Sequence, residues 1–425
     1  MKAYARVAVV AGLLLAMISV GTAMGAAPVK IGIVGPLSGG AAMVGDTLVK
    51  GAALAIKHLN ETGGIHGRQL TYVSEDDEQN PAKSVSAVNR LVFQHKVDAV
   101  VGTVNSSCQL ACQEVTQRAQ VPHVTPIASN PKVTRVGNKW VFRLQASDAQ
   151  QCTAIIDYAV NVLKLKKLAL MYQSDDYGTG GKDVIVPYLR EKYGMKLIAS
   201  EPFNPDAKDM SAQILKIKNA GADGLVMWTM YVQGALIARQ AKQLGLQVPL
   251  MGGGGLTNPK LIELAGDASY GLLNTQTFFP DPKGASPEAA AFIEAYQKEY
   301  GILPDSNAAM SYDAMMILGL AMRKAGADVN KAKVRDAMAA TIGHRGVTGV
   351  IDIDEYGSAV AVSEAITDPD VPLLLGVIPT YVAVGERVKP EAPIAVGAAI
   401  AAALVRQKIP NLSEVDVTSM EDVVI

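Results

Sequence analysis

Short apolar runs alternate with helix-like segments along most of the chain. The first apolar run covers residues 29–34 and ends at Gly35. Apolar residues then recur at the i, i+4, i+7 spacing of a helix, namely Leu48, Ala52, Ala55, Ile56 and Leu59. We expect Asp46 to cap this helix and the glycine pair at 63–64 to end it. Strands that alternate with helices over short turns predict a doubly wound parallel sheet.

The same alternation continues, and it restarts after Arg143. We expect Asn80 to cap a helix with Pro81 in its first turn, and Asp148 to cap another. Residues 173–181 are expected to form a loop, with a helix from Lys182. The remaining strands are expected at 70–73, 97–102, 121–125 and 168–172, near 198, 225 and 250, and at 272–277; helices at 287–300 and 307–325; and a β-rich stretch at 349–384. The pattern therefore predicts an α/β protein of two similar lobes joined by several crossovers.

The N-terminus carries the pattern of a secretory signal peptide. Lys2 and Arg6 precede an apolar run at residues 7–20, and small residues follow it. We expect cleavage between Ala23 and Ala27, which makes residues 1–25 the signal peptide and the mature protein a soluble one in the periplasm.

A C-terminal extension, residues 385–425, follows the α/β pattern. Residues 392–405 are alanine-rich and apolar and predict a helix that is too short to span a bilayer. Packing against the body of the protein is the favoured interpretation. Contact with a partner or a membrane surface is the alternative.

Composition narrows the possible functions. The chain has 425 residues, 49% of them hydrophobic and 19% charged, with a net charge of −1 and no basic tract, which argues against nucleic acid as a partner. The three cysteines, Cys108, Cys112 and Cys152, do not have the spacing of a metal site. Cys108 and Cys112 are expected to be free thiols, because four residues along a helix place Cβ atoms farther apart than a disulfide allows.

The chain has no pattern typical of an enzyme or a metal site. It lacks a G-x-S-x-G elbow, and its five histidines are scattered without metal-binding spacing. The acidic cluster at 75–78 precedes a helix cap and is interpreted as a solvated turn. Glycines at 252–255 are interpreted as a loop that allows close backbone approach. We therefore expect no catalysis, no cofactor and no metal.

Polar side chains at the ends of predicted strands suggest a binding site. Ser106 and Ser107 stand where a helix begins, and helix N-termini favour anions. Ser129 follows the next strand, while Tyr177 and Tyr231 each follow a strand of the second lobe. These positions at the strand ends of both lobes predict a cleft for the carboxylate of a small molecule.

Several motifs, taken in order, resemble the periplasmic solute-binding proteins of the branched-chain amino-acid (Leu/Ile/Val) ABC transporters, which have the type I periplasmic binding-protein fold. They are Ile31-Gly-Ile-Val-Gly-Pro-Leu-Ser-Gly39, Gly51-Ala52, Asn60 with Gly63-Gly-Ile-His-Gly67, Asp76-Asp77 with Pro81, Val101-Gly102 with Ser106-Ser107, Thr125-Pro126, Tyr177-Gly178, and Gly346 with Gly349. The resemblance covers residues 29–384. It implies three crossovers, near Gln145, Asn274 and Ile351. Lobe 1 would then comprise residues 26–145 and 275–351, and lobe 2 residues 146–274 and 352–384.

The resemblance also implies a ligand site. Ser106, Ile127 and Ser129, with Ala128 between the last two, match first-lobe positions that hold an amino acid's α-carboxylate and amino groups. Tyr177 and Tyr231 match the second-lobe tyrosines, and Asp148 matches an acid near the hinge. The glutamate that pairs with the ligand's ammonium in the family falls on Gly254, so this chain lacks it. Two other features of the family are also missing here. Val44 stands where an aromatic residue is often found in the family, and Gln79 and Asn105 stand where its type member has a pair of cysteines.

The resulting hypothesis is an exported receptor that captures a small carboxylated ligand by hinge closure and delivers it to an ABC permease in the inner membrane. Branched-chain or related amino acids are the default ligands. A buried ammonium without an acidic partner is costly, so a non-amino carboxylate (an aromatic or 2-oxo acid) or a small amide is the alternative. A sensory or regulatory binding protein of the same fold is a further alternative.

Overall fold

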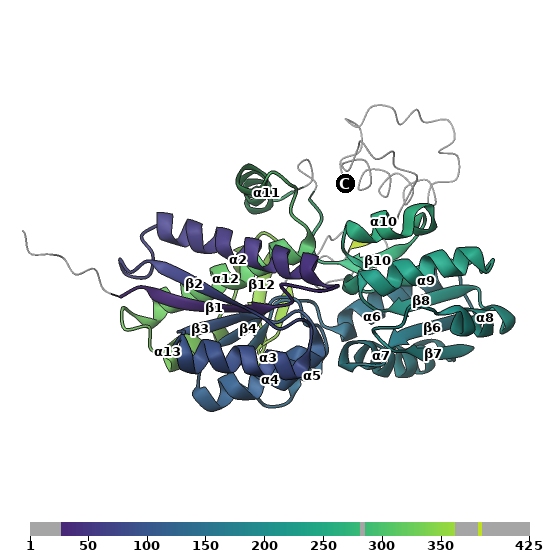
Figure 1. The fold of residues 1–425 in the computed structure, drawn as a ribbon, viewed down its shortest axis with the longest axis horizontal. Helices are drawn as coiled ribbons and strands as arrows, with labels where there is room; N and C mark the ends of the chain where they lie inside the picture. The colour runs from purple at the N-terminus through teal and green to yellow at the C-terminus, as the bar shows by residue number, and fades with distance from the viewer. Residues whose placement is uncertain (1–26, 281–284, 362–380, 385–425) are drawn as a thin grey trace, which may run out of the picture.

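The computed structural model describes residues 27–280, 285–361 and 381–384, and it shows two α/β lobes side by side (Figure 1). Each lobe is built on its own sheet, with helices on both faces. The two-lobed α/β architecture predicted from the sequence is confirmed. The predicted signal peptide and the C-terminal extension at 385–425 lie outside the described residues.

The first lobe contains a five-stranded parallel sheet with the strand order β2-β1-β3-β4-β5. Its strands are β1 (Val29–Gly35), β2 (Leu70–Asp76), β3 (Ala99–Gly102), β4 (His123–Thr125) and β5 (Val141–Arg143). Its helices are α2 (Ala42–Glu61), α3 (Pro81–Asn89), η1 (Arg90–Gln94), α4 (Ser106–Ala119), α5 (Lys132–Arg135), α12 (Ser306–Ala325) and α13 (Lys331–Ala339).

Helices α2 and α12 pack closely on one face of this sheet. A Cβ at Gly51 would lie 2.2 Å from the carbonyl oxygen of Ala308, so only glycine permits this approach of the two backbones. Apolar residues of α2, including Leu48 and Leu59, are buried in the same core as Ile31 and Ile33 of β1. The i, i+4 pattern in the sequence therefore marks the buried face of α2.

The second lobe contains a six-stranded sheet with the order β14-β10-β9-β8-β6-β7, in which only β14 runs antiparallel to its neighbour. Its strands are β6 (Leu168–Gln173), β7 (Ala199–Phe203), β8 (Gly224–Trp228), β9 (Leu250–Gly252), β10 (Leu273–Gln276) and β14 (Tyr381–Val384). Its helices are α6 (Asp148–Asp157), η2 (Tyr158–Val162), α7 (Asp176–Tyr193), α8 (Ser211–Asn219), α9 (Tyr231–Gln243), η3 (Gly254–Leu256), α10 (Lys260–Ala265) and η4 (Gly266–Ser269).

The chain passes between the lobes after β5 and again after β10, where α11 (Pro287–Tyr300) leads into α12. An antiparallel sheet of β11 (His344–Gly346), β12 (Gly349–Ile353) and β13 (Ala359–Ala361) then follows. It stays with the first lobe, since Arg143 bridges to Ser358. Strand β14 belongs to the sheet of the second lobe, where it pairs with β10. The predicted lobe limits, including a crossover near Ile351, stay a prediction.

Three predicted helix starts are wrong. Helix α2 begins at Ala42, one turn before Asp46, whose carboxylate instead pairs with Lys50 at 2.6 Å. Helix α6 is capped by Ser147 in a capping box with Gln150, and Asp148 is its first residue. Helix α7 begins at Asp176, because Asp175 accepts a hydrogen bond from the amide of Gly178. For α6 and α7 the cause is another polar residue nearby that offers a better cap, whereas α2 begins after Ala41 without any side-chain cap.

Two other local predictions, the cap at Asn80 and the free thiols of Cys108 and Cys112, are confirmed. Asn80 caps α3 by accepting hydrogen bonds from the amides of Ala82 and Lys83. Cys108, Cys112 and Cys152 are free and buried. No helix within the described part of the chain is long and apolar enough to cross a membrane.

The acidic cluster at 75–78 is only partly the solvated turn predicted from the sequence: Glu78 is exposed in a turn, Glu75 and Asp76 are half-buried, and Asp77 is buried. Asp77 is fully buried and accepts hydrogen bonds from the amide of Gln79 and the hydroxyl of Ser84. Burial raises the pKa of Asp77 to about 6. Glu75 pairs with Arg90 at 2.6 Å, and Asp76 accepts from the amide of Leu37. The cluster thus ties the loop after β1 to the end of β2.

Candidate functional site

The N-terminus of α4 forms one wall of a cavity between the lobes. Asn105 caps the helix by accepting a hydrogen bond from the amide of Ser107 at 2.8 Å. Ser106, the first residue of the helix, is 1% exposed and lines the cavity. The first amides of a helix have no partner within it, and the helix dipole is positive there. This wall therefore favours an anionic group.

The loop after β4 continues this wall. Ile127 and Ser129 line the cavity, and the carbonyl of Ser129 accepts a hydrogen bond from the amide of Asp148 at 2.8 Å. The hydroxyl of Ser106 accepts from the amide of Asn130 at 3.2 Å, which joins this loop to the start of α4. The residues of the predicted first-lobe site are thus held together by the backbone.

Two glutamines near the first passage between the lobes also reach the cavity. Gln151 accepts hydrogen bonds from the amide of Gly254 at 2.7 Å and from the hydroxyl of Thr275 at 3.1 Å. Gln145 binds its neighbouring backbone through its oxygen, which accepts from the amide of Ala146. A Cβ at Gly254 would lie 3.0 Å from Oε1 of Gln151 and 3.4 Å from Nε2 of Gln145. Amide groups therefore surround Gly254, the position at which the sequence predicts a missing acid.

Tyr177 contributes the wall of the second lobe. It lies in the first turn of α7 rather than in a loop, is 5% exposed, and packs 6.1 Å from the ring of Trp228. Its hydroxyl accepts a hydrogen bond from the amide of Gly255 at 3.2 Å. Burial raises the pKa of Tyr177 well above its ordinary value, so the phenol stays protonated and keeps a proton to donate.

The complete lining is neutral. It consists of Val44, Val104, Asn105, Ser106, Ile127, Ser129, Gln145, Gln151, Tyr177, Met230, Gly254, Gly255, Thr257 and Asn307. No acidic or basic side chain is among these described residues. The sequence motifs do not point to binding roles for Gln145, Gln151, Thr257 or Asn307. The one feature of the sequence that could have indicated these four residues is their position, since they flank the passages between the lobes or follow strand ends.

Two of the other predicted site residues make hydrogen bonds between the lobes. The hydroxyl of Ser107 accepts a hydrogen bond from the amide of Asp176 at 3.0 Å, and the hydroxyl of Tyr231 donates to the carbonyl of Gly40 at 2.8 Å. Asn105 donates to the carboxylate of Asp175 at 3.2 Å across the same boundary. Ala128 packs behind the site with Val133 and does not line the cavity. Ligand roles for these residues stay a prediction.

Asp148 lies beside the cavity and does not line it. It is fully buried, and neither carboxylate oxygen has a hydrogen-bond partner among the described residues. Burial raises the pKa of Asp148 to about 7, although nearby Ser129, Arg143 and Trp228 oppose the increase. Arg143 binds the carbonyl of Asn130 and the hydroxyl of Ser358 rather than Asp148. A carboxyl with this pKa keeps its proton at acidic pH and loses it around neutral pH.

The family model of the periplasmic binding proteins matches residues 28–374. The chain belongs to this family. It is 34% identical to an amino acid binding protein of Pseudomonas aeruginosa over 302 aligned residues. The alignment covers 71% of this chain and 80% of the relative. Over 336 residues it is 32% identical to a leucine-, isoleucine-, valine-, threonine- and alanine-binding protein of the same species, with 79% and 88% covered.

The fold agrees with the family as well. The crystal structure of a leucine-binding protein LivK from Thermotoga maritima is similar with a TM-score of 0.73 and 31% identity. The similarity covers 78% of this chain and 93% of the LivK chain. The type I fold expected from the sequence motifs is therefore confirmed.

Proposed function

We propose that this protein is an extracytoplasmic receptor of an ABC importer that captures a small carboxylated ligand between its two lobes. The observation that carries the proposal is the meeting of the α4 N-terminus with Tyr177 of the other lobe in one cavity. The amides at the helix start, together with the hydroxyls of Ser106 and Ser129, can hold a carboxylate. The lobes supply opposite walls, so binding favours the closed arrangement.

Amino acids are the first ligand class to test. The relatives named above bind amino acids by their names, and leucine recurs in two of them. Apolar side chains of Val44, Ile127 and Met230 line the cavity and suit an aliphatic group. The cavity has a volume of about 20 Å³, so its lining bears on the chemistry of the ligand and not on its size. Branched-chain amino acids suit this chemistry except at the ammonium.

A specific observation favours a second candidate, a carboxylate without an amino group. An ammonium buried without an acidic partner costs several kcal/mol, and the described lining has no acid. Gln145 directs Nε2, a donor, toward the position that a side chain at Gly254 would occupy. A keto, carboxylate or amide oxygen at this point can accept from that donor, whereas an ammonium cannot.

Calorimetry with matched ligands distinguishes the two candidates. We expect 4-methyl-2-oxopentanoate to bind more tightly than leucine, because they share a carbon skeleton and differ at the amino group. Benzoate and isobutyramide test the aromatic-acid and amide alternatives. Tighter binding of leucine would reject the second candidate and leave the first. No binding by any of the four would count against the proposed receptor function.

Hinge closure, location and partner can be tested separately. Solution scattering should give a smaller radius of gyration with saturating ligand than without it. Mass spectrometry of the protein purified from the periplasm should show loss of residues 1–25. Ligand uptake by membrane vesicles that contain the ABC permease should require this protein. Binding without uptake would favour the sensory alternative.

A further inference from the structure

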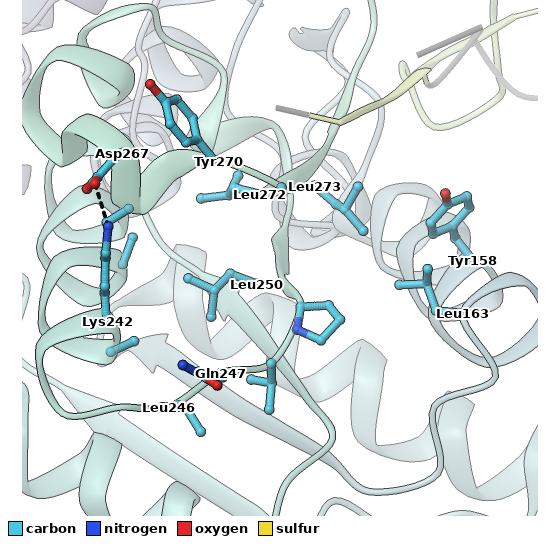
Figure 2. A pocket seen from close by; sticks show the side chains of 16 residues that line it. Tyr158, Leu163, Lys242, Leu246, Gln247, Leu250, Asp267, Tyr270, Leu272 and Leu273 are labelled. Carbon is cyan, nitrogen blue, oxygen red and sulfur yellow. Dashed lines mark ion pairs between the residues drawn. The ribbon is translucent and has the colours of Figure 1, made fainter. Parts of the chain in front are cut away.

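A second cavity lies in the second lobe (Figure 2). It shares no lining residue with the proposed ligand site. It has a volume of about 460 Å³ and is lined mainly by aliphatic side chains, including Leu163, Leu246, Leu250, Leu272 and Leu273. We call it the apolar groove. A volume of this size can hold a group of several apolar side chains.

The groove and the ligand cavity are at opposite edges of the same sheet. Leu250 and Leu273 are the first residues of β9 and β10, and both line the groove. Gly254 and Gly255, which follow the end of β9, line the ligand cavity. Because ligands of parallel α/β sheets bind at the carboxyl ends of strands, the groove has no part in the proposed capture of solute.

The pairing of β14 brings the C-terminal part of the chain to the groove. Strand β14 runs antiparallel to β10, and its last residue, Val384, pairs with Leu273. Leu273 itself lines the groove. The chain therefore leaves the described fold at the edge of the groove, and residues 385–425 follow from this point.

We propose that the apolar segment 392–405 of this extension fills the groove. Its sequence, Ala-Pro-Ile-Ala-Val-Gly-Ala-Ala-Ile-Ala-Ala-Ala-Leu-Val, has no charged residue. On a helix, Val396, Ile400 and Leu404 recur at i, i+4 and i+8 and form one apolar stripe. Pro393 suits the first turn of such a helix.

The groove is complementary to this segment in shape and polarity. Helix α9 lines it with Ala238 and Ala241, whose small side chains allow a second helix to approach closely. The ion pair of Lys242 with Asp267, at 2.6 Å, lies at the rim, and Tyr270 beside it is 47% exposed (Figure 2). An apolar centre with a polar rim is the usual arrangement at a protein interface.

The connection is long enough and favours binding within one chain. Seven residues, 385–391, separate Val384 from the segment, and an extended chain of this length spans about 23–25 Å. A short flexible linker gives an effective concentration in the millimolar range. The extension of the same chain therefore outcompetes a second copy at ordinary concentrations.

Hydrogen–deuterium exchange of the full-length mature chain tests the proposal, and no ligand is needed. A variant that ends at Val384 keeps β14 and removes the extension. We expect amides in 237–246 and 266–273 to exchange about tenfold or more faster in this variant than in the full chain. The full-length double variant Val396→Asp/Ile400→Asp should reproduce the increase, while the control Thr418→Asp should not.

Other possible occupants of the groove would give different results in these experiments. Equal exchange in the full and truncated chains would overturn the proposal. Protection that weakens on dilution, together with a dimer in sedimentation, would assign the groove to a second copy. Protection that appears only with phosphatidylglycerol vesicles would assign it to a membrane surface. Calorimetry with the best ligand should give the same affinity for the full and truncated chains, which shows that the truncated fold is intact.

Discussion

Replacing Asp148 by asparagine should change how the stability of the protein depends on pH. Asp148 is fully buried, and its carboxylate oxygens have no hydrogen-bond partner among the described residues. In the folded protein burial raises the pKa of Asp148 from 3.8 to about 7. Asparagine has nearly the same shape and does not ionise, so it isolates the effect of the charge.

The pKa values give the sign and size of the effect. Between pH 4 and pH 7 the unfolded chain has lost the Asp148 proton while the folded protein still holds it. The folded state therefore binds more protons, and its stability falls as the pH rises through this interval. A difference of about three pKa units corresponds to about 4 kcal/mol. Above pH 7 both states are ionised, and the loss is complete.

Urea unfolding at intervals from pH 4 to pH 8 measures this contribution. The free energy of unfolding of Asp148→Asn minus that of the wild type should increase by about 4 kcal/mol over this range. Asp77, Asp305 and Asp313, whose pKa burial raises to about 6, are present in both proteins and cancel in the difference. An exposed control, Asp183→Asn, should show no such trend. A difference that stays constant with pH would refute the burial argument for Asp148.

Three further predictions concern the candidate ligand site. Ser106→Ala should weaken binding of the preferred carboxylate by about 1–2 kcal/mol in calorimetry, whereas Ser86→Ala, on the exposed face of α3, should not. Gly254→Glu should raise the affinity for leucine tenfold or more relative to 4-methyl-2-oxopentanoate, because it adds an acid for the ammonium; an unchanged ratio would contradict the role given to this position. Gly255→Ala should weaken binding of every ligand, since its Cβ would lie 2.5 Å from the hydroxyl of Tyr177 and 2.6 Å from the carbonyl of Thr229. Scattering should then show a more open protein, and a compact one would contradict the prediction.

The sequence predicted the elements of the fold well because their signals are local. The apolar runs of β1 and β3, the cap at Asn80 and the start of α4 at Ser106 depend on neighbours in the chain. Two of the three errors occurred where polar residues compete for the same role. Ser147, and not Asp148, caps α6, and Asp175 caps α7 well before Lys182. In both cases the helix begins directly after a polar residue that comes earlier in the chain than the predicted start.

The site was predictable only in part, because contacts across the lobes have no local signal. Ser106, Ser129 and Tyr177 could be placed together, since each follows a strand end of a parallel sheet, and the family resemblance added Ile127. The amide environment of Gly254 depends on Gln145 and Gln151, which lie more than a hundred residues away in the chain. Likewise, the burial of Asp77 could not be inferred from four adjacent acids.

The neutral lining of the cavity also bears on how the receptor would release its ligand. A charged pair buried between the lobes would have to be separated in water on opening, whereas neutral hydrogen bonds exchange readily with solvent. Across the boundary, the amide of Asp176 bonds to the hydroxyl of Ser107 and Asn105 bonds to Asp175, at 3.0 and 3.2 Å. The neutral contact between Asp176 and Ser107 contributes about 1 kcal/mol net, and the charge-assisted one from Asn105 to the carboxylate of Asp175 contributes about 1.5–3 kcal/mol. The closed state therefore depends on a few weak contacts plus the ligand, so modest differential binding is sufficient to shift the population toward closure.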